Sequence, residues 1–365
     1  MVNITASPSR YIQGKGILGN LRLYAEKLGK KFFILVSASG KKRVEALIQS
    51  GMGDSGCSVT YEIFNGECSK KEIKRVETSF RSAVCDLFIG IGGGKTHDTV
   101  KAAAFYAKAP VVIVPTIAST DAPCSSLSVV YSEEGVFEEY VFFPSSPNMI
   151  VVDTDIVAAA PSRLLVSGMG DALATYFEAR ACVSSNATNC VGGKASLAAV
   201  KLAQLCYETL LRDGYNAKIA AETQVCTKAV ENIIEANTYL SGIGFESAGL
   251  AAAHAIHNGL TAIEETHAFY HGEKVAFGTL VQLVLENAAE DFNKVLDFCR
   301  TVGLPATLAA LGIRNPDSAR LMKTAELSCA AGETMKNMPF EVKPEMVYNA
   351  IIAADALGRA NQQAG

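Results

Sequence analysis

The chain has 365 residues, 49% of them hydrophobic and 19% charged, a composition that excludes intrinsic disorder and favours two globular domains with a large buried core. Its 33 Lys and Arg against 37 Asp and Glu give a net charge of −4 without a basic block, so we expect no nucleic-acid partner. No apolar run approaches the roughly 20 residues of a membrane helix, and the N-terminal segment MVNITASPSRYIQG is unlike a signal peptide. We therefore expect a cytoplasmic protein whose ten cysteines are reduced, because none forms a CxxC pair.

The first part of the chain alternates β-rich runs with amphipathic helical stretches. The predicted strands are 32–37, 57–64, 85–92, 111–116 and 149–153, and the predicted helices lie near 41–50, 69–81 and 95–107. Strands that are apolar throughout and are separated by helices predict a parallel sheet covered on both faces, as in a doubly wound, Rossmann-like α/β domain. The segment 128–143 breaks this pattern and predicts an inserted hairpin that turns at Glu133-Glu134-Gly135.

From Pro161 onward Ala, Leu and Glu replace the β-branched clusters, which predicts an all-helical second half. We place the boundary near Asp153 to Pro161 and expect two domains, 1–160 and 161–365.

A glycine-rich turn, GIGGGKT from Gly90 to Thr96, follows the predicted strand 85–92 and opens the next helix. Consecutive glycines let a phosphate approach backbone N–H groups, and a helix N-terminus attracts its charge. The spacing is not that of a P-loop, since Ile89 occupies the first glycine position, nor that of the dinucleotide fingerprint, since Lys95 occupies the third. The turn indicates a phosphate cradle or, alternatively, a tight turn without a ligand.

Hydroxyl side chains crowd the segment from Pro115 to Ser126, directly after the predicted strand 111–116. Ligands of open α/β sheets bind at loops that follow the carboxyl ends of strands, so these hydroxyls are candidates for holding a cofactor or a substrate. A turn capped by its own hydroxyls is the alternative.

Four of the five histidines lie close together in the helical half: His254, His257, His267 and His271. Imidazole is the commonest ligand for a borderline metal, so the cluster indicates a metal site. No fixed zinc spacing is met, and structural histidines are an equal alternative. The best candidate for a third ligand is Asp171, because an acid in an apolar helical segment is costly to bury unless a cation pairs with it. Its alternative role is an N-cap after a turn at Gly168–Gly170.

Five segments together resemble the glycerol dehydrogenases, the metal-dependent polyol branch of the iron-containing alcohol dehydrogenase superfamily. The segments are GIGGGKTxDT, PTIASTDAPCSxLSVVY, GDALATYFEARAC, EANTYLSGIGFESxGLAAAHAIHNGLTA and HxFYHGEKVAFGTL, and the resemblance runs from Tyr11 to about Met338. It implies a dehydroquinate synthase-like fold, with an NAD-binding Rossmann-like α/β domain over 1–160 and an all-α, metal- and substrate-binding domain over 161–365. A zinc and NAD site is expected in the cleft between them.

The resemblance also implies roles for individual residues. Zinc ligation falls on Asp171, His254 and His271, with Asp121 in contact with the substrate, so that these four are the expected catalytic and substrate-binding residues. His257 and His267 are not ligands in that pattern. Cofactor contacts are implied at Gly94, Lys95, Thr116, Ser119, Ser125, Leu127 and Tyr131. Family members form ring-like homo-oligomers, typically octamers, and we expect the same here.

Two positions depart from related patterns. Iron-dependent relatives resemble an Asp-x-x-x-His pattern whose histidine position is Thr175 here, so three protein ligands remain and zinc is favoured over iron. Glycerol dehydrogenases usually carry an aspartate at the end of the first strand, where Ser37 stands in this chain and is expected at the adenosine ribose. Without that carboxylate, and with Lys41, Lys42 and Arg43 close by, we expect NAD to be preferred over NADP less exclusively.

The resemblance implies zinc-dependent oxidation of glycerol and other vicinal diols, giving dihydroxyacetone from glycerol by hydride transfer to NAD. A related polyol or alcohol dehydrogenase with another substrate, such as 1,2-propanediol, is an alternative. A dehydroquinate-synthase-like lyase is disfavoured by Asp171, because that class resembles a Glu, His, His metal set, and by the neutral loop around Asp121. A non-catalytic binding protein is disfavoured because every expected ligand is present.

Overall fold

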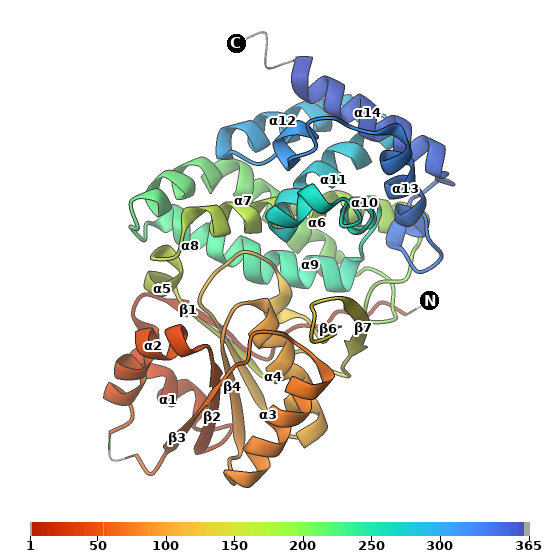
Figure 1. Cartoon of the computed structure of the whole chain (residues 1–365). Helices are drawn as coiled ribbons and strands as arrows, with labels where there is room; N and C mark the ends of the chain where they lie inside the picture. Colours follow the sequence, from red (N-terminus) through yellow and green to blue (C-terminus); the bar gives the residue numbers. More distant parts are fainter. Residues whose placement is uncertain (1, 54, 361–365) are drawn as a thin grey trace.

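The computed structural model describes residues 2–53 and 55–360 and consists of a six-stranded parallel sheet beneath a group of helices (Figure 1). The strands are β1 (Tyr11–Gly14), β2 (Lys31–Val36), β3 (Ser58–Ile63), β4 (Leu87–Gly92), β5 (Val111–Pro115), β6 (Leu127–Tyr131), β7 (Phe137–Phe142) and β8 (Met149–Asp153). The sheet order is β1-β8-β5-β4-β2-β3 with every neighbouring pair parallel, and β6 and β7 form a separate antiparallel ribbon. The expected Rossmann-like sheet and inserted hairpin are confirmed.

Both faces of the sheet are covered because its central strands carry apolar residues at successive positions, as in Phe32 to Val36 of β2. Phe32 and Ile34 of β2 point to one face and pack with α1 (Leu21–Ala25) and α2 (Ala38–Ser50), whereas Phe33 points to the other, with α3 (Lys70–Ser82) and α4 (Gly94–Ala107). This alternation follows from the two-residue period of a strand.

The second half of the chain is helical, as expected. Its α-helices are α5 (Thr154–Ala158), α6 (Ser162–Ser185), α7 (Leu197–Glu222), α8 (Lys228–Glu235), α9 (Ser241–Ala248), α10 (Ala252–Leu260), α11 (His271–Leu285), α12 (Ala289–Val302), α13 (Ser318–Ser328) and α14 (Pro344–Ala360). Short 3₁₀ turns connect several elements: η1 (Ile17–Asn20), η2 (Ala122–Cys124), η4 (Glu264–Ala268), η5 (Ala309–Leu311) and η6 (Thr334–Asn337). A π-helical turn, η3 (Ala236–Leu240), joins α8 to α9. In the part of the chain that is described, no helix has the length and apolar character to cross a membrane.

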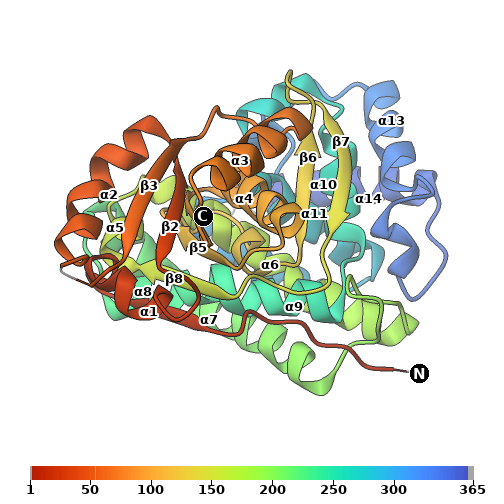
Figure 2. The same ribbon diagram turned by 90° about the horizontal axis from the view of Figure 1, so that it is seen from below.

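The two halves share one continuous core, in which Phe33 and Phe88 of the sheet belong to the same buried cluster as Phe177 and Phe277 of the helices. The N-terminal segment also crosses to the helical half, since Asn3 forms a β-bridge with Lys194; Figure 2 shows this segment running beneath the helices. The change from strands to helices falls at the end of β8, and the division into domains 1–160 and 161–365 stays a prediction.

The chain order of the sheet reverses between β2 and β4, because β3 lies on the outer side of β2 and β4 on its inner side. Ser37 and Gly93 follow these two strands and begin α2 and α4, and Thr116 follows β5 and donates its N–H to the carbonyl of Gly92. In open α/β sheets the crevice at such a reversal, at the carboxyl ends of the strands, binds the ligand. The glycine turn and the hydroxyl loop therefore meet at this edge.

Candidate metal and cofactor site

Asp171 lies in the middle of α6 and is buried, with 1% of its surface exposed. The helix runs straight through Gly168 and Gly170, so the alternative role of Asp171 as an N-cap is wrong. These glycines allow close backbone approaches instead: a Cβ on Gly170 would lie 2.3 Å from the carbonyl oxygen of Gly272, and one on Gly168 would lie 2.0 Å from that of Ala118. The first turn of α11 and the hydroxyl loop can therefore come directly against α6.

This close packing brings Asp171 together with His254 of α10 and His271 at the start of α11. The Oδ1 atom of Asp171 lies 3.4 Å from Nε2 of His254 and 3.1 Å from Nε2 of His271, and one ligand atom from each residue lies within 4.8 Å of the others. Asp171 Oδ1 is buried and has no hydrogen bond of good geometry within the described residues. One carboxylate and two imidazoles whose ligand atoms converge in this way, on an oxygen that has no well-formed hydrogen bond, fit a divalent metal ion such as zinc.

Glu178 lies two helical turns after Asp171 on α6 and contacts the ring nitrogen of His254 that faces away from Asp171. Its Oε2 lies 2.6 Å from Nδ1 of His254, and its Oε1 accepts the backbone N–H groups of Ala251 and His254 at 2.8 and 3.0 Å. A carboxylate that fixes the outer nitrogen of a ligating histidine is a recurrent feature of metal sites. Glu178 was not among the residues predicted from the sequence, although a second acid in the same apolar helix was a signal that could have indicated it.

Asp121 reaches the same centre from the hydroxyl loop, with its N–H 3.3 Å from Asp171 Oδ2. Ser241 of α9 donates its hydroxyl to Asp121 Oδ2 at 2.7 Å and lies 2.8 Å from the hydroxyl of Thr175. Thr175, which occupies the histidine position of the iron-dependent pattern, thus takes part in a chain of hydroxyls that ends on Asp121.

The pKa values of the two carboxyl groups are shifted in opposite directions. Burial raises the pKa of Asp121 well above its ordinary value, and the negative charge of Asp171 adds to that effect. Burial acts in the same direction on Asp171, but His271 and His254 outweigh it and hold the pKa of Asp171 below its usual range. Asp171 is therefore the carboxylate that is ready to meet a cation, and Asp121 is the one that is readily protonated.

The remaining histidines of the cluster lie beside the centre. The ring of His257 packs edge-on against that of His271 with centroids 4.2 Å apart, and its Nδ1 lies 3.0 Å from Asn258 Oδ1. The Nε2 atom of His267 lies 2.8 Å from the carbonyl oxygen of Thr261 at the surface. Neither residue belongs to the three-ligand group.

In the glycine turn, Gly90 and Gly92 are closely packed, whereas the space around Gly94 is open. A Cβ on Gly90 would lie 2.4 Å from Val100 Cγ1, and one on Gly92 would lie 2.8 Å from Thr96 Oγ1, so packing alone requires these two glycines. At Gly94 a Cβ would meet no protein atom within 4 Å, and the N-cap Gly93 offers no side-chain acceptor to the first N–H groups of α4. The helix start is therefore open and can receive an anion such as a phosphate.

Two other expected cofactor residues, Lys95 and Tyr131, lie at this helix start. Lys95 pairs with Glu67 and lies 5.6 Å above the ring of Tyr131. Ser125 is fully buried, and its hydroxyl donates to the carbonyl of Ala122 at 3.1 Å. Of the seven expected residues, Gly94, Lys95 and Thr116 directly follow β4 and β5, Ser119 and Ser125 lie in the segment between β5 and β6, and Leu127 and Tyr131 are the ends of the ribbon strand β6. Ser37 stands at the same edge, where its hydroxyl caps α2 by accepting the N–H of Gly40 at 3.0 Å.

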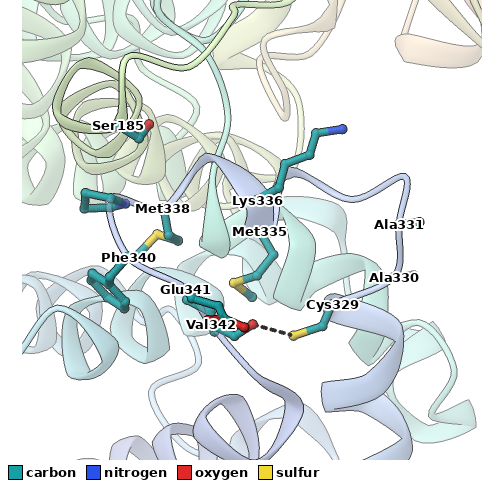
Figure 3. A pocket seen from close by; sticks show the side chains of 11 residues that line it. Ser185, Cys329, Ala330, Ala331, Met335, Lys336, Met338, Phe340, Glu341 and Val342 are labelled. Atoms are coloured by element: carbon teal, nitrogen blue, oxygen red, sulfur yellow. Dashed lines mark hydrogen bonds between the residues drawn. The ribbon is translucent and has the colours of Figure 1, made fainter.

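A cavity of about 550 Å³ lies away from this centre (Figure 3). Met335, Met338 and Cys329 line it together with Ser185, the last residue of α6. Ser185 is about 21 Å from Asp171 along the helix axis. The residues that line this cavity do not include Asp171, His254 or His271, so we assign the cavity no part in the chemistry.

Comparison with known proteins first gives the class of protein. Residues 8–154 match the family model of the iron-containing alcohol dehydrogenases. The crystal structure of glycerol dehydrogenase from Schizosaccharomyces pombe superposes with a TM-score of 0.95 at 40% identity, covering 99% of this chain and 92% of that one. With the parallel sheet, the helical half and the Asp-His-His group, these similarities define an oxidoreductase with the iron-containing alcohol dehydrogenase fold.

Curated relatives narrow the assignment. A glycerol dehydrogenase of Citrobacter freundii is 52% identical over 360 residues, which cover 98% of this chain and 99% of that protein. A glycolaldehyde reductase of Halobacterium salinarum is 45% identical over 98% of this chain and 99% of its own length. The chain belongs to the glycerol dehydrogenases of the iron-containing alcohol dehydrogenase family, as the sequence motifs indicate.

Proposed function

We propose that the chain oxidises glycerol and other small vicinal diols with NAD, using one zinc ion per subunit held by Asp171, His254 and His271. The observation that carries the proposal is the convergence of the ligand atoms of these three residues within 4.8 Å of one another. Three protein ligands are typical of a catalytic zinc, which keeps a position open for substrate. The similarity to glycerol dehydrogenases supports the choice of substrate.

A zinc ion in this position supplies Lewis acidity to adjacent oxygens of a diol, and NAD supplies the hydride acceptor. The residues of the chain supply orientation. Asp121 is held beside Asp171 by Ser241, so its carboxyl group is placed to hydrogen-bond a substrate hydroxyl. Because Asp121 is buried next to a carboxylate, it takes up a proton readily and can hold one at its carboxyl oxygens during turnover.

We further propose that NAD lies along the carboxyl edge of the sheet, with its pyrophosphate at the open start of α4 and its adenosine ribose at Ser37. The reversal of strand order between β2 and β4 supports this orientation. In this orientation the adenosine end of NAD lies at the sheet, and its nicotinamide end points toward the metal ligands of α6, α10 and α11.

A substrate panel tests the proposal. Glycerol, 1,2-propanediol and 2,3-butanediol should exceed 1-propanol in kcat/KM by about 100-fold or more, roughly 2.7 kcal/mol of additional transition-state binding, because a simple alcohol cannot offer two adjacent oxygens. Glycolaldehyde with NADH belongs in the panel because of the Halobacterium relative. Oxidation releases a proton, so the forward rate should rise toward alkaline pH. Equal efficiency on glycerol and 1-propanol would contradict the proposed chelation.

We also propose a cytoplasmic homo-oligomer. Leu211, Tyr215 and Ile219 form an exposed apolar stripe on α7, at the four-residue spacing of one helix face, which supports association. Light scattering coupled to size-exclusion chromatography measures the subunit number, with an octamer expected.

A further inference from the structure

Lys101 of α4 is a buried cation close to the cofactor edge, with 3% of its surface exposed. Its Nζ lies 3.0 Å from Asp98 Oδ1, one turn earlier on the same helix. A buried ammonium group has to be paired and fully hydrogen-bonded, since leaving its N–H groups unsatisfied is costly. Asp98 neutralises the charge of Lys101 but cannot accept hydrogen bonds from all three N–H groups of the ammonium.

The other donors of Lys101 go to backbone oxygens of a single loop. Nζ donates to the carbonyls of Ala122 at 3.1 Å, of Ser125 at 3.4 Å and of Leu127, and it lies 3.3 Å from the Ser125 hydroxyl. Carbonyls that converge on one point repel one another unless a cation lies between them. The ammonium group thus occupies the place that a bound ion takes in many ligand-binding loops.

Glu246 of α9 holds the same loop from the opposite side. Its Oε1 accepts the N–H of Ser126 at 2.6 Å and the Ser126 hydroxyl at 2.5 Å. Consecutive residues of the loop are therefore held by a cation from the sheet half and by a carboxyl group from the helical half. Both holding groups are buried, so water cannot replace either of them without a rearrangement.

The loop fixed in this way connects the two parts of the proposed active site. It begins at Asp121, whose N–H points at Asp171, and continues into β6, whose last residue, Tyr131, has its ring centre 5.6 Å from Lys95 Nζ at the start of α4. Small displacements of such positioning elements reduce binding and turnover strongly. We propose that Lys101 is a positioning residue that sets the shape of the loop 121–127 and thereby the affinity for the nicotinamide cofactor. This inference rests on the proposed function for the identity of that cofactor.

The test compares Lys101→Met, which keeps the apolar stem, and the milder Lys101→Gln with the unchanged protein. Lys74→Met on α3 is the matched control, because it removes the same charge from a side chain that is 73% exposed. The first readout is the dissociation constant of NADH, measured by the fluorescence of the nucleotide, which no tryptophan in this chain complicates. The second is amide hydrogen exchange over residues 121–131, which needs no cofactor. The third is the zinc content.

The expected result for Lys101→Met is an increase of about tenfold or more in the NADH dissociation constant, faster exchange over 121–131 and unchanged zinc. For Lys101→Gln, the NADH dissociation constant and the exchange rate should lie between those of Lys101→Met and the unchanged protein. Lys74→Met should match the unchanged protein in both. A shorter variant adds a rescue experiment, because Lys101 also lines a cavity of about 420 Å³ that can admit a small amine. Propylammonium, which replaces the Cγ, Cδ, Cε and Nζ atoms removed, should restore NADH binding to Lys101→Ala, whereas propyltrimethylammonium, which has the charge but no N–H donor, should not.

Unchanged NADH affinity and unchanged exchange in folded Lys101→Met would overturn the inference. Failure of every Lys101 variant to fold would also overturn it, because Lys101 would then stabilise the whole fold rather than the shape of one loop. If the unchanged protein does not bind NADH, the proposed function fails, and the exchange experiment alone decides whether Lys101 orders the loop.

Discussion

Glu178 Oε2 lies 2.6 Å from His254 Nδ1, so the outer nitrogen of this imidazole is engaged before any metal binds. With Nδ1–H donated to Glu178, Nε2 is the nitrogen that faces Asp171 and is available to a metal ion once it has lost its proton. The Glu178→Gln substitution keeps the size of the side chain but removes its charge, and an amide cannot accept on both ends. We expect zinc affinity to fall by about 10- to 100-fold.

Competition with a chromogenic chelator measures that affinity. Glu222→Gln is a suitable control, because Glu222 ends α7 with a side chain that is 45% exposed. Equal zinc affinity in Glu178→Gln and the unchanged protein would show that this hydrogen bond does not orient a ligand.

The ligand set itself predicts a contrast between two histidines of the same cluster. His254→Ala removes one of three ligands and should lower zinc affinity by more than about 100-fold, with activity lost and the circular dichroism spectrum retained. His267→Ala, at an exposed position outside the group, should keep its zinc and its activity. Metal analysis of both purified proteins checks this contrast.

Metal removal gives a second test of the same centre. A chelator should abolish turnover, and added zinc should restore it, because the Lewis acid is required for the reaction. Full activity in a verified zinc-free preparation would remove the metal from the mechanism.

The sequence allowed most of the fold to be predicted because its signals are local. The five apolar runs became β2, β3, β4, β5 and β8 with small shifts at their ends, and the hairpin formed where it was expected. β1 was missed because it is short and is defined by its pairing with β8, a contact between distant segments. The π-helical turn η3 was missed because no sequence period distinguishes it from an α-helix.

The site was harder to read, because its members are far apart in the chain. Asp171 and His254 belong to different helices, and only the packing of Gly170 against Gly272 explains why His271 joins them. Lys101 and Glu178 carry no motif of their own beyond the resemblance. Their importance follows from burial and from partners that the sequence does not show.

His97 predicts a pH dependence of stability. Burial, with a smaller effect of the nearby Lys101, lowers its pKa to about 3, and neither ring nitrogen has a hydrogen bond of good geometry within the described residues. The unfolded chain binds a proton at His97 below about pH 6.5. Stability is therefore fully present above that pH and is lost as the pH falls toward 3, by about 2 kcal/mol between pH 6.5 and 5.

The His97→Leu variant, similar in volume and unable to bind a proton, should lack this part of the dependence. Urea unfolding of both proteins at pH 7.5 and at pH 5 checks the prediction. The free energy of unfolding of the variant, relative to that of the unchanged protein, should be higher at pH 5 than at pH 7.5. A difference that is the same at both pH values would mean that His97 is protonated in the folded state as well.

Ser37 predicts how the chain distinguishes NAD from NADP. The residue stands at the carboxyl end of β2, beside the reversal of strand order, and caps α2 through its hydroxyl. Aspartate caps a helix as well as serine does, so Ser37→Asp should keep the fold while it adds a charge that attracts ribose hydroxyls and repels a 2′-phosphate.

Lys41, the first cation after Ser37, is engaged with other residues. Lys41 Nζ lies 3.5 Å from Glu45 and 4.9 Å from the centre of the Tyr61 ring, so it is engaged on its own helix and strand neighbour. We expect the unchanged protein to prefer NAD moderately, and Ser37→Asp to widen the ratio of kcat/KM for NAD over NADP by about tenfold or more, roughly 1.4 kcal/mol. Ser37→Asn, which caps α2 without a charge, should leave the ratio unchanged. All three proteins are compared at one ionic strength; a ratio that does not move in Ser37→Asp would place the adenosine ribose away from the end of β2.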